Sequence, residues 1–346
     1  MPITSQSVEL QLAHDRALDG ILDQQTRDLV RAWALAWDEV TPDLRDVLVD
    51  IIRAYELGDR IPRSAFARSE RLATVLAIIG SALDTLAADA GIRIVRDLPD
   101  VVAAAAGVQR DILAAQLPDG FHFPAGMRVE QAPLDAIVKR VTDRITSPRW
   151  KLSDQAYDAV RRELVRGVAV GSGPREVAAR IVKRSEGGFN GGLSRALGIA
   201  RTEILDANRA AGNYGQDRHR SVLAGWTWLA HLTPTTCRSC IAQHGSFHEL
   251  SEPGPIDHQQ GRCARFPTVK PWDAVGHGDE VEPEPSGMVD AEEWFAGLPV
   301  AAQRDILGSR GLALWRAGEW PMSEWSVRRM TRGWRDSMVP APVPSG

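Results

Sequence analysis

Cysteine is scarce in this chain. Only three of its 346 residues are cysteines, and all three lie between positions 237 and 263. Without an export signal, three cysteines argue against a disulfide framework and for a reducing compartment. The sequence also lacks an apolar run near the roughly 20 residues needed to cross a bilayer, and its start lacks the basic-then-apolar pattern of a signal peptide. We therefore expect an intracellular protein with no membrane segment.

Residue patterns of the common catalytic sites are missing as well. The glycine-rich stretch 187–192 lacks the GK[ST] ending that gives a phosphate loop its lysine and its magnesium-binding hydroxyl. Glu203 has no second carboxylate or histidine at a spacing that supports acid–base chemistry. No nucleophile–base pair stands out along the chain. The sequence therefore predicts that the protein is not an enzyme.

The composition is that of an ordinary soluble protein, with 44% hydrophobic and 25% charged residues, and the length predicts two or three folding units. The charges are unevenly spread. Residues 138–220 carry 17 basic and 9 acidic side chains, whereas residues 1–137 carry 13 basic and 21 acidic ones. A basic middle suits phosphates or an acidic partner. The alternative is a solvated surface that the chain's own acidic ends neutralise.

Apolar residues recur at helical spacing through residues 1–117. Within this helical N-terminal region, Thr41 and Pro42 predict a new helix start, and Gly91 predicts a helix end. Prolines and glycines then predict a linker over residues 118–133.

Further helices are expected in the middle of the chain. Their predicted ranges are 134–146, 153–170, 175–184 and 194–211, with the glycine-rich stretch 187–192 as a flexible connector between the last two. The run 224–230 has the pattern of a strand. The expected fold is therefore α+β and mostly helical.

The cysteines mark the most informative stretch. Cys237 and Cys240 form a C-x2-C pair, and His258 and Cys263 follow after seventeen further residues. Two ligands on a tight turn, a loop and a second His/Cys pair is the spacing of a tetrahedral zinc site. We expect a structural zinc ion held by these four residues within a small β-containing unit, 224–270. The alternative is that the reduced cysteines are buried as small hydrophobic residues.

A longer series of motifs follows along the chain: Arg201-Thr202-Glu203, Asn208, the strand with Trp226, Thr236-Cys237-x-x-Cys240, and His258 with Arg262-Cys263. In this order the series resembles the head-morphogenesis domain of the minor head proteins of tailed bacteriophages, named after the F protein of phage Mu. The resemblance covers about residues 134–270. It implies structural roles for Arg201, Thr202, Glu203, Asn208 and Trp226, and we expect Arg201 and Glu203 to lock their helix to the zinc unit.

Departures from the family pattern bear on the metal. Gly261 stands where the family has its first late cysteine, so Cys263 is alone in that segment. Thr233 and Thr235 replace an acidic residue and an arginine that are usual before the Thr-Cys turn. Three cysteines and one histidine still complete a closed zinc site, but without a spare ligand.

The C-terminal part holds an acidic connector, 271–289, and a tail, 290–346, that is rich in tryptophan and arginine and helical in pattern. Tryptophan and arginine are frequent in binding hot spots, which makes the tail a candidate docking surface. The alternative is a helical cap that packs its rings on the preceding domain. Pro340, Pro342 and Pro344 mark the end of the chain.

The resemblance implies a minor structural protein of a phage head, located in the virion and assembled in the host cytoplasm. Its implied partners are the portal protein and capsid or scaffold proteins, and its implied role is head assembly or genome packaging and delivery. The basic region 138–220 could then face packaged DNA. The alternative is a metal-dependent nuclease, suggested by Asp257-His258 near the C-x2-C pair, or a prophage-encoded toxin carrying a head-morphogenesis domain. Asparagine is absent after Tyr214, which disfavours the nuclease.

Overall fold

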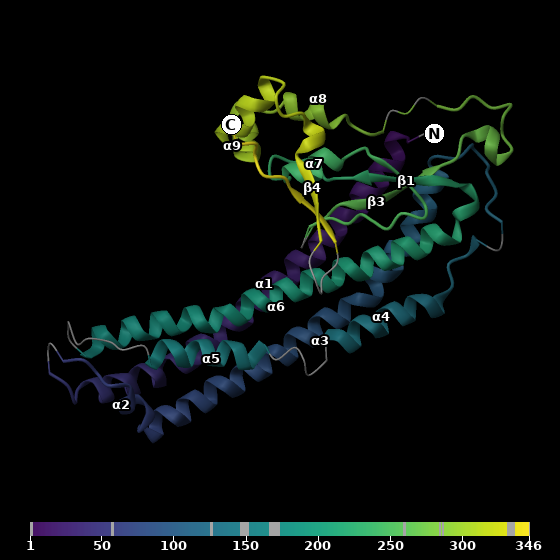
Figure 1. Cartoon of the computed structure of the whole chain (residues 1–346). Helices are drawn as coiled ribbons and strands as arrows, with labels where there is room; N and C mark the ends of the chain where they lie inside the picture. Colours follow the sequence, from purple (N-terminus) through teal and green to yellow (C-terminus); the bar gives the residue numbers. More distant parts are fainter. Residues whose placement is uncertain are drawn as a thin grey trace. The chain divides into compact units, whose positions relative to one another are not determined.

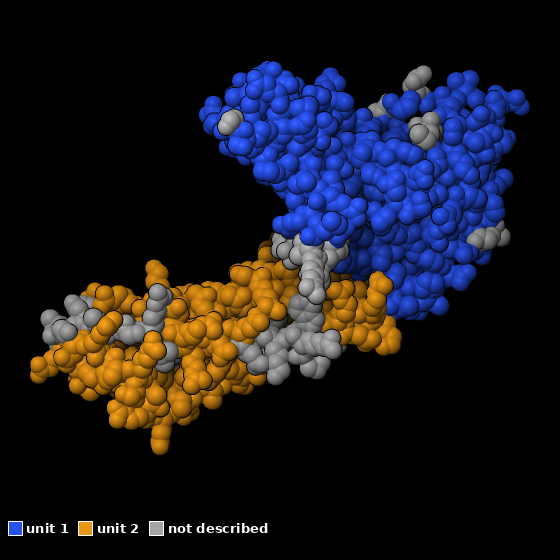
Figure 2. All heavy atoms as spheres, viewed as in Figure 1, with its two compact units in different colours: residues 1–19, 99–138, 204–346 blue, residues 20–98, 139–203 orange. Residues whose placement is uncertain are grey.

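The structure is a computed structural model of the whole chain. It describes residues 3–56, 59–124, 127–145, 152–165, 174–258, 261–283, 285, 287–330 and 336–345. The chain divides into two compact units (Figure 2). Unit 1 comprises residues 1–19, 99–138 and 204–346, and unit 2 comprises residues 20–98 and 139–203. Several long helices contribute residues to both units.

Most of the secondary-structure elements are helices (Figure 1). The α-helices are α1 (Ser5–Ile52), α2 (Arg63–Ala67), α3 (Glu70–Ala114), α4 (Gln131–Ile145), α5 (Leu152–Val165), α6 (Pro174–Arg218), α7 (Arg238–Gln243), α8 (Ala291–Ala296) and α9 (Val300–Arg316). The strands are β1 (Leu223–Leu229), β2 (Phe247–Glu249), β3 (Ala264–Val269), β4 (Ser326–Arg329) and β5 (Ser337–Pro340). The predicted α+β, mostly helical fold is confirmed, and so is the predicted strand near residues 224–230.

The predicted breaks in the N-terminal helices are wrong. Helix α1 runs without interruption through Pro42, and α3 runs through Gly91 and Pro99. Pro42 removes one hydrogen bond of the helix, which typically costs about 3 kcal/mol in a helix interior. The Thr41 hydroxyl donates to the carbonyl of Trp37 at 2.7 Å beside this break. Burial of Val40 and Leu44 on either side favours continuing the helix over ending it.

The predicted flexible connector at residues 187–192 is also wrong, because it forms the interior of helix α6. Its glycines allow close packing against α5. A Cβ at Gly188 would lie 2.9 Å from the backbone of Ala159 and Val160, and one at Gly192 would lie 3.1 Å from the Ala156 Cβ. Glycine is therefore used here for helix contact, although it lowers intrinsic helix propensity by roughly 1 kcal/mol relative to alanine.

Unit 2 is a bundle of helices around one hydrophobic core. Its buried side chains come from α1, α2, α3, α5 and α6. Phe189 of α6 is fully buried and packs on Trp37 of α1, with ring centroids 5.0 Å apart. Trp33 is buried in the same core. The tryptophans of the N-terminal region therefore serve packing.

Unit 1 contains a small antiparallel sheet with strand order β2-β1-β3. The central strand β1 pairs Trp226 with His248 on one side and with Pro267 on the other. One cluster joins Leu229 and Phe266 of this sheet to Val8 of α1 and Ile112 of α3. The Gln116 side chain donates to the carbonyl of Pro267 at 2.9 Å. The sheet is thus held against the ends of two long helices.

The C-terminal tail is only partly helical. Helices α8 and α9 are followed by an antiparallel hairpin of β4 and β5, which the helical pattern did not predict. Trp320 and Trp325 are buried in a cluster with Phe295 of α8 and Ile241 of α7. The expectation that these tryptophans form an exposed docking surface is therefore wrong, and the alternative of a packed cap holds for them. Arg332, Trp334 and Arg335 lie outside the described residues.

Residues 271–289 are held by several hydrogen bonds. The Trp272 indole donates to the carbonyl of Gln116 at 3.0 Å, and its backbone N–H donates to the Glu282 carboxylate at 2.8 Å. His277 and Glu280 pair at 2.7 Å. The acidic connector is thereby attached to the end of α3.

Helix α3 is long and apolar enough to cross a bilayer, by length and composition. Its most apolar 18-residue window has a mean hydropathy of 1.6, and a third of that window is buried inside the structure. Core helices of soluble proteins satisfy the same criterion.

Candidate metal centre

Cys237 starts helix α7 and caps it. Its backbone is extended, and its sulfur accepts the backbone N–H of Cys240 at 3.4 Å. Before it, the backbone N–H of Thr233 donates to the Thr236 hydroxyl at 2.9 Å, and the hydroxyls of Thr233 and Thr235 lie 3.0 Å apart. The two threonines that replace charged residues of the family pattern therefore build the turn that presents the C-x2-C pair.

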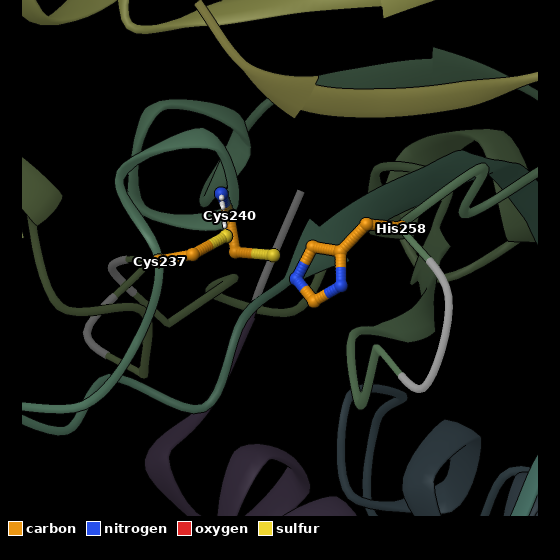
Figure 3. A group of neighbouring side chains, drawn as sticks. All are labelled: Cys237, Cys240 and His258. Carbon is orange, nitrogen blue, oxygen red and sulfur yellow. Dashed lines mark hydrogen bonds between the residues drawn. The ribbon is translucent and has the colours of Figure 1, made fainter. Parts of the chain in front are cut away.

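Three of the four predicted ligands come together. The ligand atoms of Cys237, Cys240 and His258 all lie within 4.8 Å of one another (Figure 3). Figure 3 shows both sulfurs and the imidazole pointing toward a common centre. Two thiols and an imidazole at this separation are close enough to bind one metal ion, and their chemistry fits zinc.

The fourth predicted ligand is adjacent but outside that group. Cys263 is buried in the same cluster as Cys240 and Trp228, and its thiol is hydrogen-bonded to that of Cys240. It follows the late segment that begins at His258, of which residues 259–260 lie outside the described part of the chain.

The thiols differ in acidity. The hydrogen bond with the Cys240 thiol, with smaller contributions from His258 and the backbone N–H of Cys240, lowers the pKa of Cys237 to about 4. The pKa of Cys240 is raised, first by its hydrogen bond to Cys237 and then by that to Cys263. Cys237 is therefore the more easily ionised of the two thiols, and a metal ion that binds both would displace the proton of Cys240.

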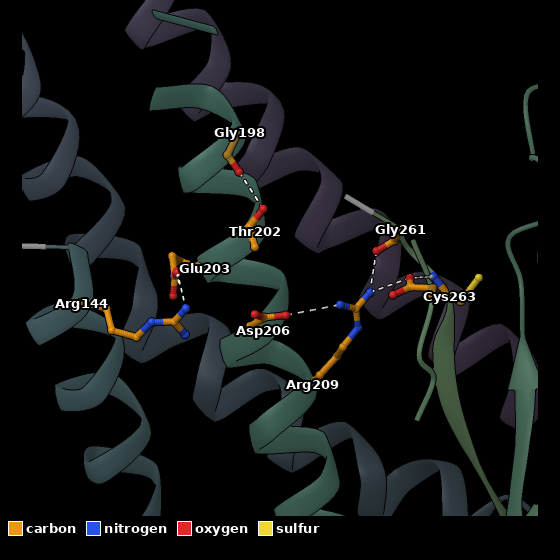
Figure 4. A network of polar contacts seen from close by, with 9 residues as sticks. Arg144, Gly198, Thr202, Glu203, Asp206, Arg209, Gly261 and Cys263 are labelled. Carbon is orange, nitrogen blue, oxygen red and sulfur yellow. Dashed lines mark hydrogen bonds and ion pairs between the residues drawn. The ribbon is translucent and has the colours of Figure 1, made fainter. Parts of the chain in front are cut away.

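A buried ion pair holds the late segment in place (Figure 4). Asp257 is fully buried, and its carboxylate accepts from Arg209 of α6 at 2.7 Å and from the Cys263 backbone N–H at 3.3 Å. Arg209 also donates to the carbonyl of Gly261 at 2.6 Å. Breaking such a pair leaves an uncompensated buried charge, which typically costs about 3–5 kcal/mol.

This ion pair leaves no room for a side chain at position 261. A Cβ at Gly261 would lie 2.1 Å from the Asp257 carboxylate oxygen, so a cysteine cannot fit there without rearrangement. The sequence reasoning missed Arg209, although it directly follows the motif residue Asn208 on α6.

The Arg-Thr-Glu motif lies in unit 2, where Glu203 is almost fully buried and forms an ion pair with Arg144 of α4 at 3.1 Å (Figure 4). The Thr202 hydroxyl donates to the carbonyl of Gly198 at 2.7 Å, and Arg201 lines a small cavity beside Leu22 of α1. We expected Glu203 to connect α6 to the zinc unit, but its ion pair is with Arg144 of α4, so this ion pair does not make that connection. In unit 1, Arg209 connects α6 to the segment around Asp257 and Gly261.

The other two motif residues are in unit 1. The Asn208 side-chain oxygen is 2.8 Å from Nε2 of His14. Both residues line a small cavity, with Asp15, Arg262 and Cys263 among its other lining residues. Trp226 is buried, stacks on His248 with ring centroids 4.1 Å apart, and donates its indole N–H to the carbonyl of Glu252 at 3.2 Å.

The structure also brings together three side chains that the sequence reasoning did not single out. The Ser246 hydroxyl oxygen lies 2.9 Å from Nε2 of His248, whose Nδ1 lies 3.0 Å from the Glu252 carboxylate. The signal in the sequence was a Ser-x-His pair with a glutamate four residues after the histidine.

Comparison with known proteins found no matching family model, no similar curated protein and no similar solved structure.

Proposed function

We propose that this chain is a minor structural protein of a tailed-phage head. The proposal is supported by the ordered series of motifs that resembles the head-morphogenesis domain, and above all by the meeting of Cys237, Cys240 and His258 at one point. The chain brings these residues together from two segments separated by seventeen residues. Such convergence is expected of a structural metal site in a small unit.

In this proposal the metal is zinc, and Cys263 is its fourth ligand. Bound zinc would join the N-terminal end of α7 to the late segment after residue 257, two elements that the sheet alone does not connect. The protein side chains do the rest of the positioning: Arg209 and Asp257 fix the late segment, and the threonine turn fixes α7. Zinc supplies the cross-link and takes part in no reaction.

The partners follow from the same resemblance. The chain would bind the portal protein and capsid or scaffold proteins and act in head assembly or in genome packaging and delivery. Because Trp320 and Trp325 are buried, docking uses other surfaces than those rings. Exposed cations on α6, such as Arg175 and Lys183, would contact packaged DNA through its phosphates.

Co-expression with the portal and capsid genes tests the proposed function. We expect the full chain to co-purify with portal rings or procapsids. Cys240→Ser should reduce this association, because loss of zinc loosens the unit that carries α7. His277→Gln, which changes a histidine outside the metal group, should bind as the unchanged chain does.

The proposal fails if the folded chain does not associate with any head component. DNA cleavage by the pure protein that disappears in His258→Ala would instead assign the chain to the metal-dependent nucleases.

A further inference from the structure

We propose that Ser246, His248 and Glu252 form a serine-type acyl-transfer site, which cleaves an ester or amide of an extended peptide segment laid along strand β2. The proposal does not depend on the metal or on the head-protein role. It rests on the order nucleophile, base and carboxylate, with separations of 2.9 Å and 3.0 Å. These distances are within the hydrogen-bond reach that activation of a serine requires.

The hydrogen bonds of Glu252 set the proton positions. One carboxylate oxygen accepts the Glu249 backbone N–H at 3.1 Å, and the other faces Nδ1 of His248. The hydrogen bond to His248 and that to Glu249 lower the pKa of Glu252, so it is a carboxylate. A carboxylate only accepts, so a hydrogen on Nδ1 faces Glu252, which leaves Nε2 as the atom that faces Ser246 as the base.

Packing orients the base. The imidazole of His248 stacks on Trp226 at an interplanar angle of 13°, and the Arg265 guanidinium lies 4.6 Å from the centre of the same indole. Trp226 is held in turn through its N–H by the Glu252 carbonyl. The Ser246 hydroxyl has a second acceptor, the carbonyl of Gln243 at 2.7 Å, so its proton must turn from that carbonyl to Nε2 before attack.

Strand β2 provides a site for the oxyanion. It is an outer strand of the sheet. The Ser246 carbonyl accepts the Trp228 N–H of β1 at 2.9 Å, and the next positions of the ladder pair Phe247 with Thr227 and His248 with Trp226. The alternation of an antiparallel ladder therefore directs the backbone N–H of Phe247 away from β1. Glu249 has the same orientation and bonds outward to Glu252. An extended peptide pairing with this edge would place a carbonyl oxygen at the Phe247 N–H, directly after the nucleophile.

The reaction balances with water as the only co-reactant. Ser246 Oγ attacks the carbonyl carbon while its proton moves to His248 Nε2. The tetrahedral oxyanion collapses, the bond to the leaving amine or alcohol breaks, and the leaving group takes that proton. Water then attacks the acyl-serine and gives a proton to Nε2. As the bond between the acyl carbon and Oγ breaks, Nε2 passes this proton to Oγ, which releases the carboxylic acid and restores the Ser246 hydroxyl.

A fluorophosphonate reagent tests the site in the full chain, because the activated oxygen forms an O–P bond and displaces fluoride. We expect mass mapping to locate the adduct on Ser246 and to find none in Ser246→Ala. His248→Gln should slow labelling by about 100-fold or more, the usual contribution of a general base. The exposed Ser251→Ala serves as the matched control and should label at the unchanged rate.

If His248→Gln does not fold, Glu252→Gln replaces it as the test variant, because glutamine keeps the shape of the side chain. This substitution should slow labelling of Ser246 at least tenfold. Near-ultraviolet circular dichroism verifies that each variant retains its tryptophan packing. Labelling of Ser246 no faster than that of Ser251, or a rate that neither substitution changes, overturns the proposal.

Discussion

At the scale of single residues, buried polar groups decide how the segment around the cysteines is built. Arg209 satisfies Asp257 and the Gly261 carbonyl together, and the resulting close approach excludes any side chain at Gly261. Local packing in this segment therefore requires glycine at position 261. The same contacts determine where Cys263 lies relative to Cys240.

Asp15 makes the folding stability of the chain depend on pH. It lines the same cavity of unit 1 as Asn208, where burial raises its pKa to about 7; Gln11 and Arg262 oppose the shift, and Asp19 adds to it. His14, whose pKa burial lowers, faces the same cavity. An unfolded aspartate titrates near pH 3.9. The folded chain therefore keeps a proton that the unfolded chain loses, and the stability from neutral Asp15 is lost as pH rises from about 4 to about 7.

Asp15→Asn should remove this dependence. The free energy of unfolding of the variant, relative to that of the unchanged chain, should be higher at pH 8 than at pH 5. The expected increase is on the order of 1 kcal/mol after allowance for solvent screening of a half-buried group. Urea unfolding at the two pH values measures the difference. The exposed Asp23→Asn controls for the loss of one negative charge. A stability difference that is equal at both pH values would contradict the assignment.

At the scale of elements, the sequence predicted helices and the first strand but placed the breaks wrongly. Pro42, Gly91 and the glycines of 187–192 are strong local signals, yet each lies inside a continuous helix. The buried partners that override them are distant in sequence and do not appear in local spacing. Three candidate metal ligands could be predicted because C-x2-C and a later histidine form a recognisable spacing, whereas the role of Arg209 depends on its tertiary contacts with Asp257 and Gly261. The Ser246 group is local in sequence, but a Ser-x-His pair with a later glutamate is too common a pattern to be singled out.

Helix α6 offers an element-scale test of this reasoning. Gly188→Ala adds a Cβ at 2.9 Å from the backbone of α5, so it should destabilise unit 2 by about 1–3 kcal/mol, as overpacking does. Gly187→Ala and Gly191→Ala add a Cβ with nothing within 4 Å and should stabilise the helix by roughly 0.5–1 kcal/mol. Thermal unfolding of the three variants separates the two effects. Equal stabilisation by all three would show that α5 does not pack closely on Gly188.

At the scale of the whole molecule, the chain passes between two units several times, so neither unit is one contiguous segment. The cysteines, their supporting ion pair and the tail cluster all belong to unit 1, and the Arg-Thr-Glu motif belongs to unit 2. Exposed cations of unit 2 and the proposed metal centre of unit 1 are therefore separate features of one chain. A structural role in a phage head would use both, the first toward DNA and the second to maintain the fold.

Zinc content tests the central claim most directly. Elemental analysis of the full chain, purified without chelators, should find about one zinc per molecule, and structural zinc should contribute several kcal/mol to folding. Cys240→Ser should lose the metal, melt at lower temperature and become protease-sensitive over residues 224–270, whereas His277→Gln should keep it. A chain that contains no zinc, together with a melting temperature unchanged by Cys240→Ser, would contradict the account.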